Sequence, residues 1–289
     1  HAPSDVNGFS FSPDGKNILF TRNVKLDTTA VDRYPDLPKN TAKIYDDLMY
    51  RHWDAWADGT YAHLFIAPVN DTENAVELLK GERFHSPVPS SGGMEEAVWS
   101  PDGKKIAYCC KRATGKDFAL STNTDIFIYD LASQQTINIT EGNQGYDMDP
   151  VWSPDGSKIA WWSMETPGFE SDKKRLMIYD VKKDSSDYCT PDFDYNAESF
   201  VWSDKGDKVY FLSCVEATYQ VYSFDLASRA IDTLTNGDHD YNSLALAGNK
   251  LIATMTRHDL PAEIFSIDLE TKQTKQITFT NKDILDKID

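Results

Sequence analysis

Short apolar runs alternate with turn-forming residues along most of the chain. One phrase recurs four times: an apolar run, a turn of the Ser-Pro-Asp-Gly kind and a second apolar run. In such a turn Pro fixes φ, Asp bonds to the local backbone and Gly accepts a positive φ. Each copy therefore predicts a β-hairpin. The copies span residues 11–20, 99–108, 152–161 and 202–211, and a weaker fifth copy spans 246–253.

A second phrase follows each hairpin and predicts a third strand. It ends on an aspartate in four repeats, at Asp130, Asp180, Asp225 and Asp268, so that subtraction gives spacings of 50, 45 and 43 residues. A short run rich in Ile and Thr comes next and predicts a fourth strand. Four short strands in every repeat of about 45 residues are typical of a propeller blade.

The sequence thus predicts an all-β fold, a β-propeller of four-stranded blades with five blades present. Five blades either close a ring or belong to a larger one, and the repeats leave both open. Residues 1–280 form the predicted propeller, and 281–289 begin a linker. The predicted blades span about 9–80, 96–141, 150–191, 199–236 and 243–279.

The first blade carries an insertion between its second and third strands. From Thr41 the apolar residues Ile44 and Leu48 recur at helical spacing, and Trp53 and Trp56 continue the pattern. We therefore expect a helix over about 41–56, with Asn40 or Thr41 as its N-cap. Such an insertion either carries binding groups or covers a sheet edge.

The charge and composition of the chain argue against some classes of function. The chain has 289 residues and a formal net charge of −17 at pH 7. A field of that sign repels phosphate backbones, so nucleic acid is not an expected partner, whereas cationic groups are attracted. No apolar run approaches the roughly 20 residues of a membrane span. The chain opens with His1 rather than Met, so we expect a processed or excised piece.

Motifs for a self-contained catalytic site are missing. The sequence has no GxSxG elbow, no HExxH pair, no P-loop and no GxGxxG fingerprint. Its four cysteines, Cys109, Cys110, Cys189 and Cys214, include no CxxC spacing, which argues against structural zinc. We therefore predict no catalytic residue, no metal site and no cofactor within the chain.

Acidic residues gather in the loops that lead into the first strands. In a propeller these strands line the central channel, so the loops ring one of its mouths. Such a ring suits a cationic group, for example a peptide ammonium. The alternative is that these carboxylates are solvated surface. The candidate binding residues in these loops are Glu95, Glu96, Asp147, Asp149 and Glu198.

The phrase Trp-Ser-Pro-Asp-Gly-Lys-Lys-Ile-Ala at 99–107, with Ile-Tyr-Asp-Leu at 128–131 and a closing Ile-Thr, resembles the propeller domain of the prolyl oligopeptidase family of serine peptidases. Residues 50–59 and the tail 281–289 are similar to the dipeptidyl-peptidase and acylaminoacyl-peptidase branch. TolB-type propellers share the single-blade motif.

The resemblance implies a partner domain that this chain lacks. In the family the propeller, usually of seven or eight blades, caps an α/β-hydrolase domain whose Ser, Asp and His perform acyl transfer. Dipeptidyl peptidases of the family grip the substrate amino terminus with a Glu pair on a propeller extension. Two pairs in this sequence could take that role: Glu95 with Glu96, and Asp46 with Asp47. The resemblance also favours a bacterial periplasmic or secreted protein, and it is compatible with an oligomer.

These observations favour the substrate-gating propeller of a serine exopeptidase that cleaves short peptides. Its partners would be a C-terminal α/β-hydrolase domain of the parent protein and short peptide substrates. The chain alone is then expected to be inactive. Two alternatives stay open: a TolB-type propeller that binds a protein partner, and an enzyme complete within these residues.

Overall fold

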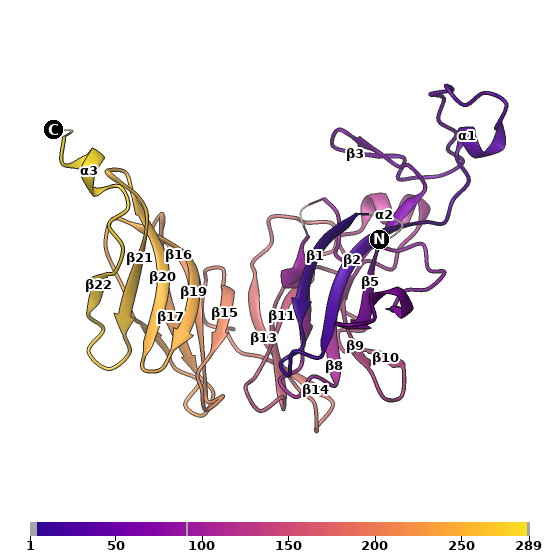
Figure 1. Cartoon of the computed structure of the whole chain (residues 1–289). Coiled ribbons are helices and arrows are strands. Elements are labelled where there is room, and N and C mark those ends of the chain that lie inside the picture. Colours follow the sequence, from indigo (N-terminus) through magenta and orange to yellow (C-terminus); the bar gives the residue numbers. More distant parts are fainter. Residues whose placement is uncertain (1–4, 91, 288–289) are drawn as a thin grey trace. The chain divides into compact units, whose positions relative to one another are not determined.

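The computed structural model describes residues 5–90 and 92–287, and over these residues the chain is built mainly from β-strands (Figure 1). The described strands form five four-stranded sheets and one two-stranded sheet. The expected all-β fold of repeated four-stranded antiparallel sheets is confirmed. That the five sheets are five blades of one propeller remains a prediction. His1 and the last two residues of the predicted linker lie outside the described residues.

Strands that are neighbours in the sequence are also neighbours in each sheet. The first sheet contains β1 (Val6–Phe11), β2 (Asn17–Lys25), β5 (Thr60–Pro68) and β6 (Val76–Glu77). The second contains β7 (Ala97–Trp99), β8 (Lys105–Cys110), β9 (Asp125–Asp130) and β10 (Gln135–Asn138). The third contains β11 (Asp147–Trp152), β12 (Lys158–Ser163), β13 (Arg175–Asp180) and β14 (Ser185–Tyr188). The fourth contains β15 (Glu198–Trp202), β16 (Lys208–Val215), β17 (Thr218–Asp225) and β18 (Ile231–Thr233). The fifth contains β19 (Asp240–Ala247), β20 (Lys250–Arg257), β21 (Leu260–Asp268) and β22 (Thr274–Gln276).

Other elements are short. The two-stranded sheet pairs β3 (Arg51–His52) with β4 (Ala55–Trp56). The helices are α1 (Ala30–Arg33), α2 (Gly115–Leu120), α3 (Lys282–Leu285) and the 3₁₀ turns η1 (Thr72–Asn74) and η2 (Met94–Glu96). No helix among the described residues is long and apolar enough to cross a membrane. The chain divides into two compact units, His1–Pro150 with Met164–Asp172, and Val151–Ser163 with Lys173–Asp289.

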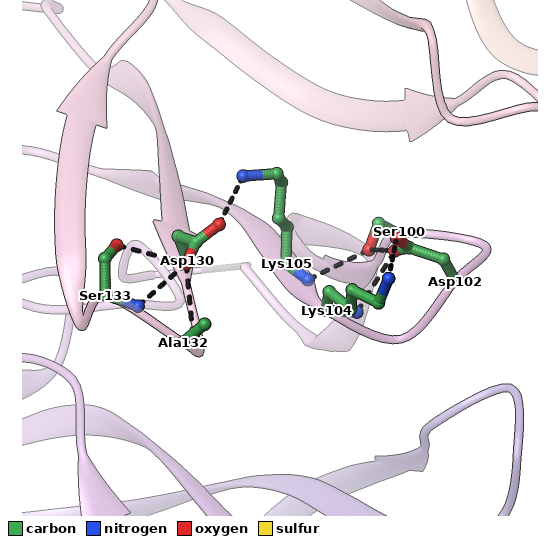
Figure 2. A network of polar contacts seen from close by, with 7 residues as sticks. All are labelled: Ser100, Asp102, Lys104, Lys105, Asp130, Ala132 and Ser133. Atoms are coloured by element: carbon green, nitrogen blue, oxygen red, sulfur yellow. Dashed lines mark hydrogen bonds and ion pairs between the residues drawn. The ribbon is translucent and has the colours of Figure 1, made fainter.

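Side-chain hydrogen bonds explain why the turn phrase recurs (Figure 2). Ser100 Oγ donates to Asp102 Oδ1 at 2.7 Å and accepts from the backbone N–H of Lys105 at 2.9 Å. The same Asp102 oxygen accepts from the N–H of Lys104 at 3.1 Å. Gly103 takes a φ of +68°, which an L side chain rarely adopts. Ser, Asp and Gly therefore each perform a separate task in closing the hairpin.

The aspartate that ends the third strand has an equally local role (Figure 2). Asp130 Oδ1 accepts from the N–H groups of Ala132 and Ser133 at 3.1 and 2.9 Å. Its other oxygen accepts from Lys105 Nζ at 2.5 Å, across the β8–β9 pair. The carboxylate thus closes the turn to β10 and ties it to the second strand. Asp180, Asp225 and Asp268 accept the same pair of turn N–H groups in their own sheets.

The threonine that closes each of the last four sheets is a hydrogen-bond acceptor for the third strand. Its hydroxyl oxygen accepts from the backbone N–H of the residue 14 positions earlier, so this third-strand N–H has an acceptor where the fourth strand ends. The pairs are Ile126–Thr140 at 3.0 Å, Leu176–Thr190 at 3.1 Å, Val221–Thr235 at 2.9 Å and Ile264–Thr278 at 2.8 Å.

Thr190→Val is expected to destabilise the chain by about 1–3 kcal/mol, because it leaves the buried Leu176 N–H without an acceptor. Thr190 is 2% exposed, so water does not replace the lost partner. Urea unfolding of both proteins measures the difference. Thr190→Ser keeps the acceptor and is the matched control. Equal losses in the two variants would show that the methyl group, not the hydrogen bond, carries the stabilisation.

Tryptophans of the first strands link neighbouring sheets inside each unit. In the first unit, Trp99 Nε1 donates to the carbonyl of Ser10 at 3.5 Å. In the second unit, Trp202 Nε1 donates to the carbonyl of Val151 at 3.0 Å. Each unit also has its own apolar core, for example around Leu64, Ile106 and Tyr108 in the first. These links and cores hold the loops described below at fixed positions on their sheets.

The expected helix over 41–56 is wrong. These residues form an irregular segment and the β3–β4 hairpin, within an insertion that we call the arm (residues 26–59). Asn40 does not cap a helix; its Oδ1 accepts from the N–H of Ala42 at 2.8 Å, as in a turn. Ile44 and Leu48 are 39% and 41% exposed, so the helical spacing has no core to face. A short helix without a buried face is not stable in water.

Ring contacts replace the helix in the arm. Tyr45 and Tyr50 lie 5.6 Å apart between ring centroids, and each stacks on Trp56, at 6.0 and 6.2 Å. The guanidinium of Arg51 lies 5.4 Å from the centre of the Trp56 ring. Tyr45 also donates its hydroxyl to the carbonyl of Ala57 at 2.8 Å. Aromatic and β-branched residues favour such hairpins over helices.

Candidate functional site

Two of the candidate carboxylates occupy the same place in consecutive repeats. Glu96 ends η2 and lies three residues before Trp99, and Asp149 lies three residues before Trp152. Asp149 has a φ of +56°, and Ser199, three residues before Trp202, has a φ of +58°. Non-glycine residues in this region are uncommon, and β-bulges near strand ends re-aim side chains next to functional sites. Asp149 and Ser199 therefore stand at equivalent irregular positions of two successive first strands.

Glu96 is buried and holds the preceding loop. Glu96 is 2% exposed, and its Oε2 accepts from the N–H of Val88 at 2.7 Å. Burial raises the pKa of Glu96 to about 8, and the carboxylates of Asp149 and Glu95 add to the rise, while the bond from Val88 opposes it. Near neutral pH this carboxyl group therefore holds its proton.

Two glycines make room for the glutamates. A Cβ on Gly92 would lie 2.3 Å from Glu96 Oε1 and 2.4 Å from the Val88 carbonyl oxygen. A Cβ on Gly93 would lie 2.6 Å from Glu95 Oε2. At Gly92 a side chain would meet the Val88 backbone, so this position needs glycine, whereas at Gly93 the exposed Glu95 carboxylate can move aside.

Asp147 and Cys109 lie close to Glu96 and Asp149. Asp147 is 1% exposed, and its Oδ2 accepts from Asn143 Nδ2 at 2.9 Å. Burial raises the pKa of the Cys109 thiol well above its usual value, and the charges of Glu96 and Asp149 add to it. A thiol that keeps its proton is not a nucleophile. Cys109 is thus a buried, protonated neighbour of these carboxyl groups.

The structure brings four of the seven candidate residues together, and these four form what we call the acidic cluster: Glu95, Glu96, Asp147 and Asp149. Glu95 is exposed and Asp149 is half-buried, whereas Glu96 and Asp147 are buried.

The other three candidates lie elsewhere. Glu198 belongs to the second unit, where its Oε2 accepts from Lys174 Nζ at 2.5 Å. Asp46 and Asp47 are exposed on the arm. The Oδ2 of Asp47 lies 2.6 Å from the point that a Cβ on Gly115 would occupy, so the arm reaches the start of α2.

Sequence reasoning missed three parts of this site: the Val88 backbone donor, the two glycines and Cys109. One signal was available, because Glu96 and Asp149 stand at the same offset from the repeated tryptophan. The Val88 contact had no such signal, since it joins two loop residues that no motif relates.

The repeats match a known protein family. A family model described as "TolB beta propeller domain" matches residues 96–285. A curated relative, the dipeptidyl-peptidase 5 of Porphyromonas gingivalis, is 40% identical over 285 residues, which cover 98% of this chain and 42% of that protein. The dipeptidyl-peptidase 5 of Porphyromonas endodontalis is 38% identical over 285 residues, covering 98% of this chain and 41% of that protein. The chain thus spans about two-fifths of the curated relatives it matches.

Solved structures share the fold. An acylaminoacyl peptidase of Pyrococcus horikoshii superposes with a TM-score of 0.70 at 16% identity, covering 99% of this chain and 40% of that one. A putative TolB of Agrobacterium tumefaciens gives a TM-score of 0.58 at 14% identity, covering 95% of this chain and 81% of that one. At such low identity these likenesses bear on the fold alone.

Proposed function

The chain belongs to the TolB β-propeller domain family, and on this premise we propose that it is the substrate-gating propeller of a serine exopeptidase of dipeptidyl-peptidase type. The observation that carries the proposal is the 40% identity to a dipeptidyl-peptidase 5 across 98% of the chain. The catalytic α/β-hydrolase domain lies outside residues 1–289 in this account. Short peptides are the substrates, because a narrow propeller channel excludes folded proteins.

The acidic cluster supports a role in holding the substrate amino terminus. An ammonium group needs ionised carboxylates that are open to it. Glu95 is exposed and Asp149 is half-buried, so we assign the grip to these two. Glu96 keeps its proton near neutral pH and serves instead to fix the loop that carries Glu95. Asp147 is buried, and Glu198 belongs to the second unit.

Steady-state kinetics of the parent protein test this grip. Glu95→Gln with Asp149→Asn is expected to raise the KM for free-amine dipeptide substrates at least about ten-fold, because both carboxylates of the grip are removed and the loss of roughly 1.4 kcal/mol already corresponds to a factor of ten. The kcat is expected to change little. Asp46→Asn with Asp47→Asn on the arm is the matched double variant and is expected to leave KM unchanged. A rise only in the arm variant would move the grip to Asp46 and Asp47, and no rise in either would end the proposal of an amino-terminus site in this chain.

A binding module of TolB type is the second candidate, favoured by the match of residues 96–285 to a family model described as a TolB propeller domain. A serine-directed fluorophosphonate separates the two. A peptidase parent is expected to be labelled at a serine outside residues 1–289, and the chain 1–289 alone is expected to stay unlabelled. A parent that no such reagent labels is a binding protein, and labelling within residues 1–289 would mean that the chain holds its own active site.

A further inference from the structure

A cavity of about 260 Å³ lies within the second unit, and residues of the third and fourth sheets line it. Ile178 of β13, Phe224 of β17 and Leu226 directly after β17 form its apolar wall. Lysine, serine and aspartate residues of the third sheet and its turns form its polar wall. An apolar wall with a few polar groups is typical of a site for a small molecule.

The ion pair that the other sheets repeat is rearranged at this cavity. In the second and fourth sheets, a lysine at the start of the second strand pairs with the aspartate opposite it on the third strand. These pairs are Lys105–Asp130 at 2.5 Å and Lys208–Asp225 at 3.5 Å. Lys158 stands opposite Asp180 in the same register of the third sheet. Here, however, Asp180 Oδ2 lies 3.1 Å from Lys183 Nζ. Lys158 Nζ instead donates to Ser157 Oγ at 3.2 Å, a neutral hydroxyl where the repeat supplies a carboxylate.

Other carboxylates of this region also have partners. Asp187, which lines the cavity, has its Oδ2 at 2.5 Å from Arg229 Nη1. Asp155 precedes Lys158 by three residues and accepts from two serine hydroxyls of its own turn, at 2.6 and 2.8 Å. Lys158 lines the cavity as well, so the cavity has a cation whose usual partner is bound elsewhere. Such a cation favours an anionic ligand, to which a lysine donates charge-assisted hydrogen bonds.

Arg229 links the two sheets beside the cavity. Besides its ion pair with Asp187, its Nη2 donates to the carbonyl of Tyr188 at 2.7 Å, and its guanidinium lies 5.7 Å from the centre of the Phe224 ring. Cys189 lines the same wall, and burial raises the pKa of its thiol to about 12, so the thiol stays neutral. A wall that is fixed in this way has little freedom to lose when a small ligand binds.

The edge strand β14 gives the cavity its contact with water. Ser185 and Ser186 of this strand line the cavity and are exposed. The side chain of Lys183 is 76% exposed at the preceding turn. The serine hydroxyls both donate and accept hydrogen bonds, so they suit the polar end of a ligand that enters here.

We propose that this cavity binds a small organic carboxylate with an apolar body, whose carboxylate pairs with Lys158 while its body packs on Ile178, Phe224 and Leu226. The cavity is smaller than the roughly 300–1,000 Å³ of sites for drug-sized ligands, so its ligand has the size of an amino acid or a dipeptide. A dipeptide and a free carboxylic acid share this chemistry. Only the dipeptide as the source rests on the proposed function, of which it would be the product.

Isothermal titration calorimetry of the parent protein, treated beforehand with a fluorophosphonate, tests the proposal with three probes. Isocaproate is the free carboxylic acid, glycyl-leucine is the dipeptide, and glycyl-leucinamide is the same dipeptide without the carboxylate. Isocaproate and glycyl-leucine are expected to bind, and the amide is expected to bind at least about ten-fold more weakly, because it lacks the partner of Lys158. Tighter binding of glycyl-leucine than of isocaproate would identify a peptide as the source, and equal binding would identify free carboxylic acids.

Substitutions of the lysine locate the binding. Lys158→Met is expected to weaken the binding of glycyl-leucine at least about ten-fold, and Lys158→Arg, which keeps the charge, is expected to retain it. Lys105→Met is the matched control, since Lys105 holds the same place in the second sheet but is paired with Asp130. It is expected to leave the affinity unchanged. Ser186→Trp narrows the cavity from the exposed strand β14 and is expected to weaken binding as Lys158→Met does.

Three results would contradict the proposal: no heat from either carboxylate probe, equal affinity for the dipeptide and its amide, or equal effects of Lys105→Met and Lys158→Met. Ser186→Trp decides the matter if Lys158→Met does not fold. The fluorophosphonate reports on the peptidase proposal by labelling a serine, and the calorimetry reports on the cavity. A failure of one proposal is therefore distinguishable from a failure of the other.

Discussion

The free energy of unfolding of the wild-type chain is expected to fall as the pH rises from about 5 to about 8. In Glu96→Gln this fall is expected to be absent. In the unfolded chain a glutamate ionises near its ordinary pKa of 4.5, whereas in the folded chain burial raises the pKa of Glu96 to about 8. Between these values the folded state holds one more proton than the unfolded state, so the free energy of unfolding falls as the pH rises. Over the whole window the loss is about 5 kcal/mol.

Urea unfolding at both ends of the window measures this effect. The variant is expected to match the wild type near pH 4, where position 96 is mostly uncharged in the folded and the unfolded states of both proteins, and to be the more stable protein above about pH 8. The amide oxygen of the introduced glutamine can still accept from the Val88 N–H, so the loop contact is kept. Glu95→Gln changes the exposed neighbour and is expected to leave the pH dependence nearly as it was. Parallel pH dependences for Glu96→Gln and the wild type would contradict the account of a protonated, buried Glu96.

Gly145→Ala is expected to destabilise the chain by more than about 3 kcal/mol, because no space exists for the added methyl group. A Cβ at this position would lie 2.1 Å from the carbonyl oxygen of Met164 and 2.6 Å from its carbonyl carbon. Both are backbone atoms, and they are held by the bond from the Met164 N–H to the Tyr146 carbonyl at 2.7 Å. The backbone has to move for the variant to fold.

Gly81→Ala is the control for backbone strain alone. Gly81 has a φ of +79°, and a Cβ there would meet nothing within 4 Å. Its expected cost is about 1–2 kcal/mol, the penalty of a left-handed conformation. Thermal unfolding of both variants compares them, and a loss at position 145 no greater than that at position 81 would show that the loop at Met164 yields easily.

The repeated sheets were predictable because each residue of the motif acts locally. The Ser100–Asp102 turn and the Asp130 turn are closed by side chains within five residues of the atoms that they bind. Sequence patterns record such short-range requirements directly. The closing threonine works over 14 residues, but the β-ladder fixes that distance in the last four sheets.

The arm was not predictable in the same way. Ile44 and Leu48 have helical spacing, yet no apolar face covers them, and the stack of Tyr45, Tyr50 and Trp56 follows no single period. Spacing predicts a helix only where a core rewards it. The burial of the binding candidates was not predictable for a related reason. The sequence of the pair Glu95 and Glu96 does not show which side chain is buried, because Glu96 is buried by the loop that contains Val88.

The most direct test of the central claim measures the release of dipeptides by the parent protein. The substrates share one amino-terminal sequence, and they differ in size and in whether the amino group is free or acetylated. The account predicts efficient release from short free-amine peptides, a large loss of kcat/KM when the amino group is acetylated, and no cleavage of the same sequence at the terminus of a folded protein. Equal cleavage of free and acetylated peptides, or cleavage of the folded protein, would contradict a substrate-gating propeller of dipeptidyl-peptidase type.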